Sequence, residues 1–399
     1  MKAFLDLRGE DFRTDPHAVL RRFREADWRA DTTHGTAVLR YDEVQAMLSS
    51  WSLRTPGADF LATQGITEGP LVDAMRGFLP SSDGGTHQRL RRSVGRSFTV
   101  RRVEDFRSTA GFVADELVDG LGAEFDFVAD FAHPFALRTL CRFIGVPEDV
   151  ERVVSEWTAD VGLIFGFSVA EHAPRIEAAL ANLHEFIDDL LDQRRRTPRD
   201  DLLSSLVDQS LTEAELRSLV VTLLSAGQGT VQHQLGGAMT AFLAFPDQWR
   251  LLAADSSLAE RAAEEVVRHS PSTLLGPPRI TKEDIVLNGV SLPAGSRVLP
   301  ITGSANRDAA VFDEPDRLDI TSTRTAHLTY GGGIHYCLGA ALARVELQEA
   351  LPRLARALPS VRANGTAEWL PPTEAGYGPT SLPLARDRGV SALVERIGP

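Results

Sequence analysis

Cys337 is one of only two cysteines in the 399-residue sequence, and it lies in the segment HLTYGGGIHYCLG, residues 327–339. Three chemistries are open to it. A structural zinc site normally takes four nitrogen or sulfur ligands, and only His335 is close in sequence. A hydrolytic nucleophile needs a base within hydrogen-bond reach, whereas His335 on an extended loop would lie roughly 6 to 7 Å away. An axial thiolate ligand of haem iron needs one cysteine in a loop of the right shape.

The glycines before Cys337 and the helix predicted after it favour the haem ligand. Glycine lets a backbone approach a flat macrocycle and adopt positive φ. LGAALARVEL, residues 338–347, predicts a helix whose first N–H groups and dipole would stabilise an anionic sulfur, with Gly339 letting this turn pass close to the ring. The other cysteine, Cys141, lies among apolar residues at helical spacing, which predicts a packed core residue.

The segment YGGGIHYCLGAALARVE, residues 330–346, resembles the haem-ligand signature of the cytochrome P450 family. Every fixed position of that signature matches except Tyr330, where the family usually has phenylalanine. The resemblance runs from DPHAVLRRF, residues 15–23, to LPLARDRG, residues 382–389. It implies one P450 domain over residues 1–399: mainly α, a triangular helical bundle with a minor β-sheet portion. Haem b, iron protoporphyrin IX, would lie between a long central helix and the loop of its ligand Cys337.

Other segments resemble the family in order and spacing. In DGGTHQRLRRSVGRSFT, residues 83–99, His87 and Arg91 are four residues apart, which places both on one helix face. The resemblance assigns these two residues, with Arg279 and His335, to the haem propionates. It also implies that Glu265 and Arg268 form a buried network with Arg317, the arginine of EPDRLD.

LLSAGQGTVQHQLGG, residues 223–237, corresponds to the central helix of the family, on the side of the ring where oxygen binds. The family pattern is Ala/Gly-Gly-x-Asp/Glu-Thr, and this chain has Ala226, Gly227, Gln228, Gly229 and Thr230. Small residues leave room for dioxygen, and the Thr230 hydroxyl can hold a water. In the family the acid helps to relay protons; here they would come from water, from substrate, from Gln228, or from His233 if the helix is distorted.

Two glycines within three residues predict a local bulge in this central helix, since each costs on the order of 1 kcal/mol relative to alanine. Close crossing of another helix is the alternative explanation of these glycines.

The pattern of apolar residues in the rest of the chain predicts the elements that position the site residues. Apolar residues recur at helical spacing over the first two-thirds of the chain, and Thr212 with Glu215 forms a capping-box pattern before the central helix. After about residue 270, Pro, Gly and β-branched residues predict short strands.

Composition limits the partners and the location. A formal net charge of -13 argues against nucleic acid as the main partner. No run reaches the ~18 apolar residues of a membrane span, and no signal peptide is visible, so we expect a cytoplasmic protein without a membrane anchor. RLRRSVGRSFTVRR, residues 89–102, nevertheless contains six arginines. This basic segment is either a solvated face or a docking surface, and the resemblance implies an acidic ferredoxin at Arg92, Arg96 and Arg344.

The resemblance implies a haem-thiolate monooxygenase that oxidises a small organic molecule such as a natural product. Electrons would come from NAD(P)H through a ferredoxin reductase and a ferredoxin. Rival functions are oxidative coupling or cyclisation without oxygen insertion, a peroxide-driven reaction, and a haem sensor or carrier without turnover. The sequence leaves the oligomeric state open. Substrate-facing positions are expected, by resemblance, in residues 54–82, 161–173, 274–275 and 374–382.

Overall fold

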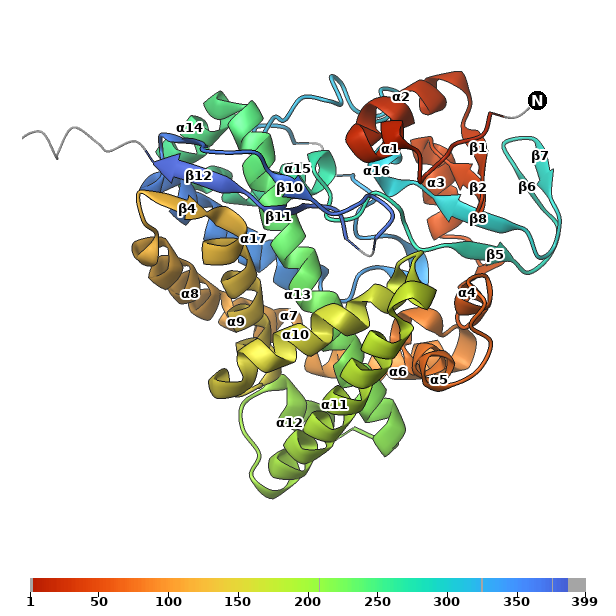
Figure 1. Ribbon diagram of the computed structural model, residues 1–399, viewed down its shortest axis with the longest axis horizontal. Coiled ribbons are helices and arrows are strands. Elements are labelled where there is room, and N and C mark those ends of the chain that lie inside the picture. The colour runs from red at the N-terminus through yellow and green to blue at the C-terminus, as the bar shows by residue number, and fades with distance from the viewer. Residues whose placement is uncertain (1–2, 208, 324–325, 375, 387–399) are drawn as a thin grey trace, which may run out of the picture.

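The computed structural model describes residues 3–207, 209–323, 326–374 and 376–386. Its helices are packed around the long helix α13 (Glu213–Ala244), which runs through the middle of the molecule behind α10 (Glu151–Gly162) and α11 (Val169–Arg196) (Figure 1). The other α-helices are α1 (Glu10–Thr14), α2 (Pro16–Ala26), α3 (Tyr41–Leu48), α4 (Asp59–Ala62), α5 (Pro70–Gly77), α6 (Gly84–Ser97), α7 (Val100–Asp105), α8 (Arg107–Gly120), α9 (His133–Ile144), α12 (Leu202–Val207), α14 (Pro246–Ala254), α15 (Ala259–His269), α16 (Thr302–Ala305) and α17 (Ala340–Ala357).

The strands form small sheets, as the sequence predicts for the last third of the chain. They are β1 (Arg29–Thr32), β2 (Gly35–Val38), β3 (Leu53–Arg54), β4 (Glu124–Asp126), β5 (Arg279–Thr281), β6 (Ile285–Leu287), β7 (Val290–Leu292), β8 (Arg297–Pro300), β9 (Val361–Ala363), β10 (Glu368–Trp369), β11 (Pro379–Ser381) and β12 (Pro383–Arg386). The largest sheet has the order β1-β2-β8-β5-β3, with β2 and β8 parallel and the other pairs antiparallel. It lies beside α1, α2 and α3 (Figure 1).

Helix α13 begins with the predicted capping box. The Thr212 hydroxyl accepts from the Glu215 N–H at 3.3 Å, and the Glu215 carboxylate accepts from the Thr212 N–H at 3.0 Å. Apolar side chains on several sides of the helix are buried against α9, α10, α11 and α15, which explains a sequence that is apolar for most of its length. The predicted core residue Cys141 is fully buried on α9.

The predicted bulge in α13 is wrong, because the helix is regular from Glu213 to Ala244. A Cβ at Gly227 would lie 2.6 Å from Leu140 Cδ1 of α9, so Gly227 permits close helix crossing. The Gln228 amide is hydrogen-bonded to Ser155 at 2.6 Å and to Thr158 at 2.9 Å, both on α10. Helix α13 is thus held against α9 at Gly227 and against α10 at Gln228, which explains why the helix stays regular there.

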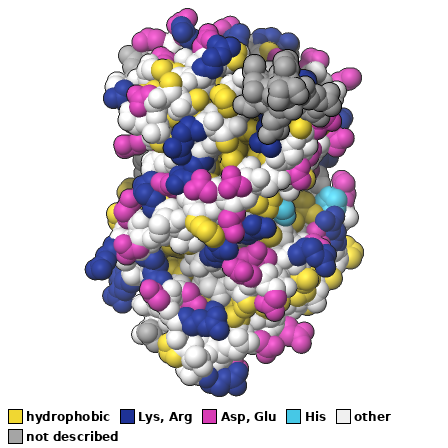
Figure 2. Space-filling view, turned by 90° about the vertical axis from the view of Figure 1, so that its left-hand side faces the viewer, with side chains coloured by type: hydrophobic (Ala, Val, Ile, Leu, Met, Phe, Trp, Pro, Cys, Tyr) yellow, Lys and Arg dark blue, Asp and Glu magenta, His cyan; other side chains and the backbone are white. Residues whose placement is uncertain are grey.

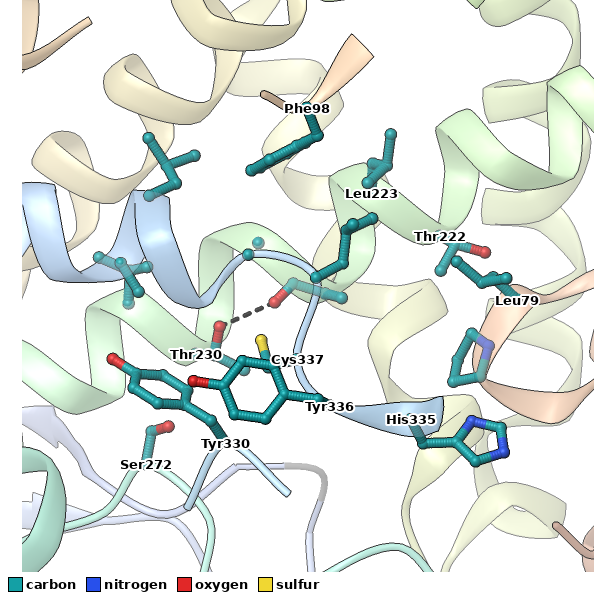
Figure 3. A pocket seen from close by; sticks show the side chains of 18 of the residues that line it. Leu79, Phe98, Thr222, Leu223, Thr230, Ser272, Tyr330, His335, Tyr336 and Cys337 are labelled. Atoms are coloured by element: carbon teal, nitrogen blue, oxygen red, sulfur yellow. Dashed lines mark hydrogen bonds between the residues drawn. The ribbon is translucent and has the colours of Figure 1, made fainter. Parts of the chain in front are cut away.

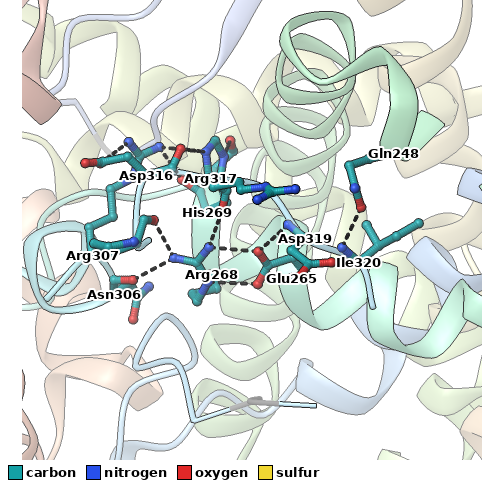
Figure 4. Close-up of polar contacts among 12 residues, drawn as sticks. Gln248, Glu265, Arg268, His269, Asn306, Arg307, Asp316, Arg317, Asp319 and Ile320 are labelled. Carbon is teal, nitrogen blue, oxygen red and sulfur yellow. Dashed lines mark hydrogen bonds and ion pairs between the residues drawn. The ribbon is translucent and has the colours of Figure 1, made fainter. Parts of the chain in front are cut away.

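Helix α15 is joined to the chain before the cysteine loop by a buried network (Figure 4). Arg268 forms a bidentate pair with Glu265 at 2.8 Å on both sides, as expected from their spacing. The expected contribution of the Arg317 side chain is wrong. Arg268 donates to the Arg317 carbonyl oxygen at 2.9 Å, while the Arg317 guanidinium pairs with Glu314 at the surface. The arginine that enters the cluster is Arg307, which donates to the His269 carbonyl at 2.7 Å.

Charges of both signs are interspersed on the face shown in Figure 2. This face therefore presents no extended basic surface. Of the described helices, none combines the length and the apolar character that a membrane crossing requires.

Replacing Gly227 and Gly229 by alanine, one at a time, distinguishes the contributions of these two glycines of α13 to stability. Gly227→Ala should lower the free energy of unfolding by about 1–3 kcal/mol, because its methyl group would collide with Leu140. Gly229→Ala should leave stability unchanged or raise it by up to about 1 kcal/mol, because its Cβ would meet only His233 Cε1, at 3.8 Å. Urea unfolding of the haem-loaded variants measures both values, and equal destabilisation would contradict the assigned packing.

The arginines of the α15 network provide a second matched pair. Arg268→Ala should lower the free energy of unfolding by about 3–5 kcal/mol, since it leaves the Glu265 carboxylate buried without its cation. Arg317→Ala should change it by no more than about 0.5 kcal/mol, because that side chain is 57% exposed. Denaturant unfolding monitored by the Soret band and by circular dichroism tests both; a large loss in the Arg317 variant would show that its side chain contributes after all.

Candidate active site

A cavity of about 340 Å³ separates α13 from the loop that carries Cys337 (Figure 3). All the predicted site residues except Gly229 line it: Ala226, Gly227 and Thr230 from α13, with His87, Arg91, Arg279, Tyr330, His335, Cys337 and Gly339. The rest of the lining is mostly apolar and includes Leu79, Phe98, Leu140 and Leu342. Segments far apart in the sequence therefore meet around one space, with a thiol on one side and small residues on the other.

The glycines of the loop shape its backbone. Gly331 and Gly333 have φ values of 73° and 59°, which side-chain-bearing residues rarely adopt. A Cβ at Gly333 would lie 2.9 Å from the Leu48 carbonyl oxygen at the end of α3, and one at Gly332 would lie 3.1 Å from Leu48 Cβ. The close approach that these two glycines allow is thus to α3. Gly339 is different, because a Cβ there would meet no atom nearer than Cys337 Sγ at 4.0 Å.

The Cys337 sulfur lies at the start of α17, as expected. Burial raises the pKa of the thiol, while the Gly339 and Ala340 N–H groups and the charges of Arg91 and Arg344 act in the opposite direction. The Cys337 N–H donates to the Tyr330 carbonyl oxygen at 2.8 Å, which closes the loop. Helix N-terminal donors around a cysteine favour its anionic form, the form that binds a metal.

Basic side chains lie around one part of the cavity. His87 and His335 have ring centroids 4.5 Å apart. The His335 ring contacts Asp83 at 2.9 Å, and Arg91 donates to the Tyr336 carbonyl oxygen at 2.7 Å. His87 Nδ1 is buried and has no hydrogen-bond partner among the described residues. The pKa of His87 is lowered to about 4, mainly by burial and to a smaller extent by the charges of His335 and Arg91.

Tyr330, the one departure in the loop, is packed among polar groups. The Arg344 guanidinium lies 4.6 Å from its ring centroid and pairs with Glu264 at 2.6 Å. The Tyr330 hydroxyl is buried without a hydrogen-bond partner in the described part of the chain. The Tyr336 ring is nearby, with centroids 6.3 Å apart (Figure 3).

On the opposite side, α13 contributes a face of small residues and one hydroxyl. The Thr230 hydroxyl donates to the Ala226 carbonyl oxygen at 2.8 Å (Figure 3). Its oxygen lone pairs remain available to a water or a ligand in the cavity. Gln228 is not available as a proton donor there, because its amide is held by α10. Gly229 lies outside the lining.

Two polar residues at the site were missed from the sequence. Asp83 holds His335, and its pKa is lowered by hydrogen bonds from His335 and Thr55 although burial opposes this. Glu346 lines the cavity and is joined to Thr139 by a 2.6 Å hydrogen bond; burial raises its pKa to about 8. Both lie within quoted motifs, DGGTH and ARVE, so their positions were visible while their partners were not.

The expected substrate-facing segments contribute unequally to the cavity. Leu79 and Pro80 line it, whereas no residue of 161–173, 274–275 or the described part of 374–382 does. Phe165 and Phe167 instead pack on Phe78 and Phe60, with ring centroids 5.7 and 5.4 Å apart. Ala375 and residues 387–389 of the quoted segments lie outside the described residues.

The residues present fit a haem. A buried histidine nitrogen without a partner and two arginines in one part of the cavity suit anionic propionates, and a lone cysteine surrounded by N–H donors suits iron.

Comparison with known proteins agrees with this chemistry. The cytochrome P450 family model matches residues 254–359. Luteothin monooxygenase of Streptomyces thioluteus is 36% identical, over 96% of this chain and 95% of its own length. Cytochrome P450 107B1 of Saccharopolyspora erythraea is 35% identical, over 88% and 89%. Further relatives are named as hydroxylases, an epoxidase and an N-oxygenase.

Among solved structures, the crystal structure of CalO2 superposes with a TM-score of 0.91 at 30% identity, covering 98% of this chain and 100% of that one. The fold predicted from the loop is therefore confirmed. Full-length similarity, the cavity and its thiol lead to one conclusion: the chain belongs to the cytochrome P450 family, whose cofactor is haem, and it is an oxidoreductase of the monooxygenase class.

Proposed function

We propose that this protein oxidises a small, largely apolar organic molecule, in the tailoring of a natural product, with electrons from NAD(P)H through a ferredoxin reductase and a ferredoxin. The observation that carries the proposal is the mostly apolar cavity between the Cys337 thiol and the small-residue face of α13. Apolar surface binds such a molecule by excluding water, while few polar groups fix its orientation. A relative named for the oxidation of luteothin supports the substrate class.

In this proposal Cys337 would ligate the haem iron, and His87, Arg91, Arg279 and His335 would hold the propionates. A haem bound through a thiolate would supply the activation of dioxygen. The protein's part is to bind and orient the substrate and to manage protons. Ala226 and Gly227 would leave space beside a bound haem, and the Thr230 hydroxyl, whose own proton goes to the Ala226 carbonyl oxygen, would accept a hydrogen bond from a water in the cavity.

The ferredoxin would dock on the basic segment of α6. Arg92 and Arg96 are four residues apart, both are exposed, and neither has an ion pair among the described residues. Their charge is therefore free for an acidic partner. Arg344 is a weaker candidate, because its guanidinium is held by Glu264 and by the Tyr336 hydroxyl.

Oxidative coupling without oxygen insertion is a second candidate, raised by the departure from the family pattern at Gly229. Coupling removes two hydrogen atoms from the substrate, joins the two atoms that carried them and leaves both oxygens of dioxygen as water, so it needs the same supply of protons and electrons as oxygen insertion.

Spectra and labelled turnover test the proposal. The reduced protein with carbon monoxide should give the red-shifted Soret band of a thiolate ligand, and this band should be absent in Cys337→His. Organic ligands that shift the ferric spin state are then turned over with ferredoxin, reductase, NADPH and ¹⁸O₂. One labelled oxygen in the product establishes monooxygenation, unlabelled coupled product establishes the second candidate, and no oxidation of any spin-shifting ligand would refute both.

Charge reversal tests the docking face. Arg92→Glu with Arg96→Glu should slow reduction by ferredoxin roughly 10-fold at low salt, because steering by opposite charges is lost, and the difference should shrink at high salt. The matched control is Arg250→Glu on α14, which lies well away from α6 in Figure 1 and should leave the rate unchanged. An equal effect of both reversals would place the docking site elsewhere.

A further inference from the structure

His233 lies one helical turn beyond Gly229 and is the only titratable residue between Arg217 and Asp247. Residues four apart share a helix face. The helix α13 is regular, so no distortion is needed to place His233 near Gly229. A Cβ built at Gly229 would meet His233 Cε1 at 3.8 Å and no other atom within 4 Å outside the backbone of the helix. The imidazole therefore lies beside the position where the family carries its acid.

The loop between β10 and β11 is shaped around this imidazole. A Cβ at Gly376 would overlap the ring, lying 2.5 Å from His233 Cε1, and a Cβ at Gly378 would lie 2.7 Å from His233 Cβ. Between these glycines, the Tyr377 N–H donates to the Ser272 carbonyl oxygen at 2.6 Å. Ser272 lines the cavity, so the loop that encloses His233 is attached to the wall of the site.

The surroundings of the ring favour its neutral form. His233 Nδ1 is buried and has no hydrogen-bond partner among the described residues. Burial alone lowers the pKa of His233 to about 4, and no charged side chain contributes to this shift. A neutral imidazole has one nitrogen that accepts a proton and one that donates. It is thus suited to passing protons on at neutral pH without holding a charge.

We propose that His233 carries protons past the Gly229 turn of α13 towards Thr230, in place of the absent carboxylate. In this proposal the ring takes up a solvent-derived proton at one nitrogen and releases one from the other to a water bound at Thr230, so it is neutral before and after. Other candidates are engaged elsewhere: Gln228 is bound to α10, and Glu346 to Thr139. This inference rests on the proposed monooxygenase function, and its test has one part that is independent of turnover.

The independent part measures the pKa of His233 by NMR in the haem-loaded, reduced, carbon monoxide-bound protein, with His233→Gln to assign the signal. Gly229→Asp should raise the pKa of His233 by roughly one to two units, because a carboxylate would lie beside the ring. Gly229→Ala, the matched control, should leave it near the wild-type value. An unchanged pKa in Gly229→Asp would overturn the placement of the ring beside residue 229.

The second part measures product formed per NADPH consumed, and the solvent deuterium isotope effect on turnover. His233→Phe keeps the ring volume and removes the proton carrier, so the coupling ratio should fall roughly 10- to 100-fold. The double variant Gly229→Asp with His233→Phe should recover most of it, which loss of packing alone could not produce. His133→Phe removes another imidazole that contacts α13, at Gln232 (3.0 Å) and Gln228 (3.5 Å), but does not lie within 4 Å of a Cβ at Gly229, and it should not change the ratio.

The outcomes separate the two proposals. If the wild type lacks the thiolate-type band or oxidises no ligand, the proposed function fails while the NMR measurement still tests the position of His233. If the wild type is active and His233→Phe keeps the wild-type coupling ratio and isotope effect, the proton-carrying role is overturned. Should the phenylalanine variant not fold, His233→Gln takes its place in this comparison. If the double variant Gly229→Asp with His233→Phe does not recover the coupling ratio, the proton-carrying role of His233 is overturned as well.

Discussion

The proposed site depends on stabilising the anionic form of Cys337 in a mostly apolar cavity. Burial alone would protonate Cys337, and the chain opposes this with the first N–H groups of α17 and with two arginines nearby. Those donors converge only if the loop before Cys337 turns sharply. Gly331 and Gly333 supply the left-handed turns, and α3 lies so close to Gly332 and Gly333 that a side chain would not fit there without a shift. The candidate ligand Cys337 is thus positioned by elements from both ends of the chain.

The second wall of the cavity follows a different principle. Helix α13 has to approach α9 closely and still stay straight, and it achieves this with one glycine against Leu140 and with an amide bound to α10 on the adjacent side. Gly229 is not required by packing, since its missing side chain leaves open space next to His233. The two glycines of the motif therefore differ in role: Gly227 is required by packing, and Gly229 is free of that constraint.

Much of the site could be predicted from the sequence because its residues are held by local geometry. Cys337, Gly339 and the helix after them lie within one motif, and the spacing of His87 and Arg91 places both on one face of α6. The capping box and the Glu265–Arg268 pair are likewise local and were predicted correctly. The errors came from long-range contacts. Arg317 was expected in the network, yet Arg268 needs only its carbonyl oxygen, and the guanidinium that enters the cluster belongs to Arg307.

The sequence by itself determined the family, the candidate ligand Cys337 and the order of the elements, because the family's signature consists of particular residue types at fixed short spacing. Only the tertiary structure decided which partners these residues meet. It placed Leu140 against Gly227, Asp83 against His335, and the Gly376–Gly378 loop around His233. Each of these contacts joins segments more than 80 residues apart, and no local pattern encodes how such segments pack. The physical reason is that helix crossings and loop positions are set by the complementary shapes of several surfaces at once.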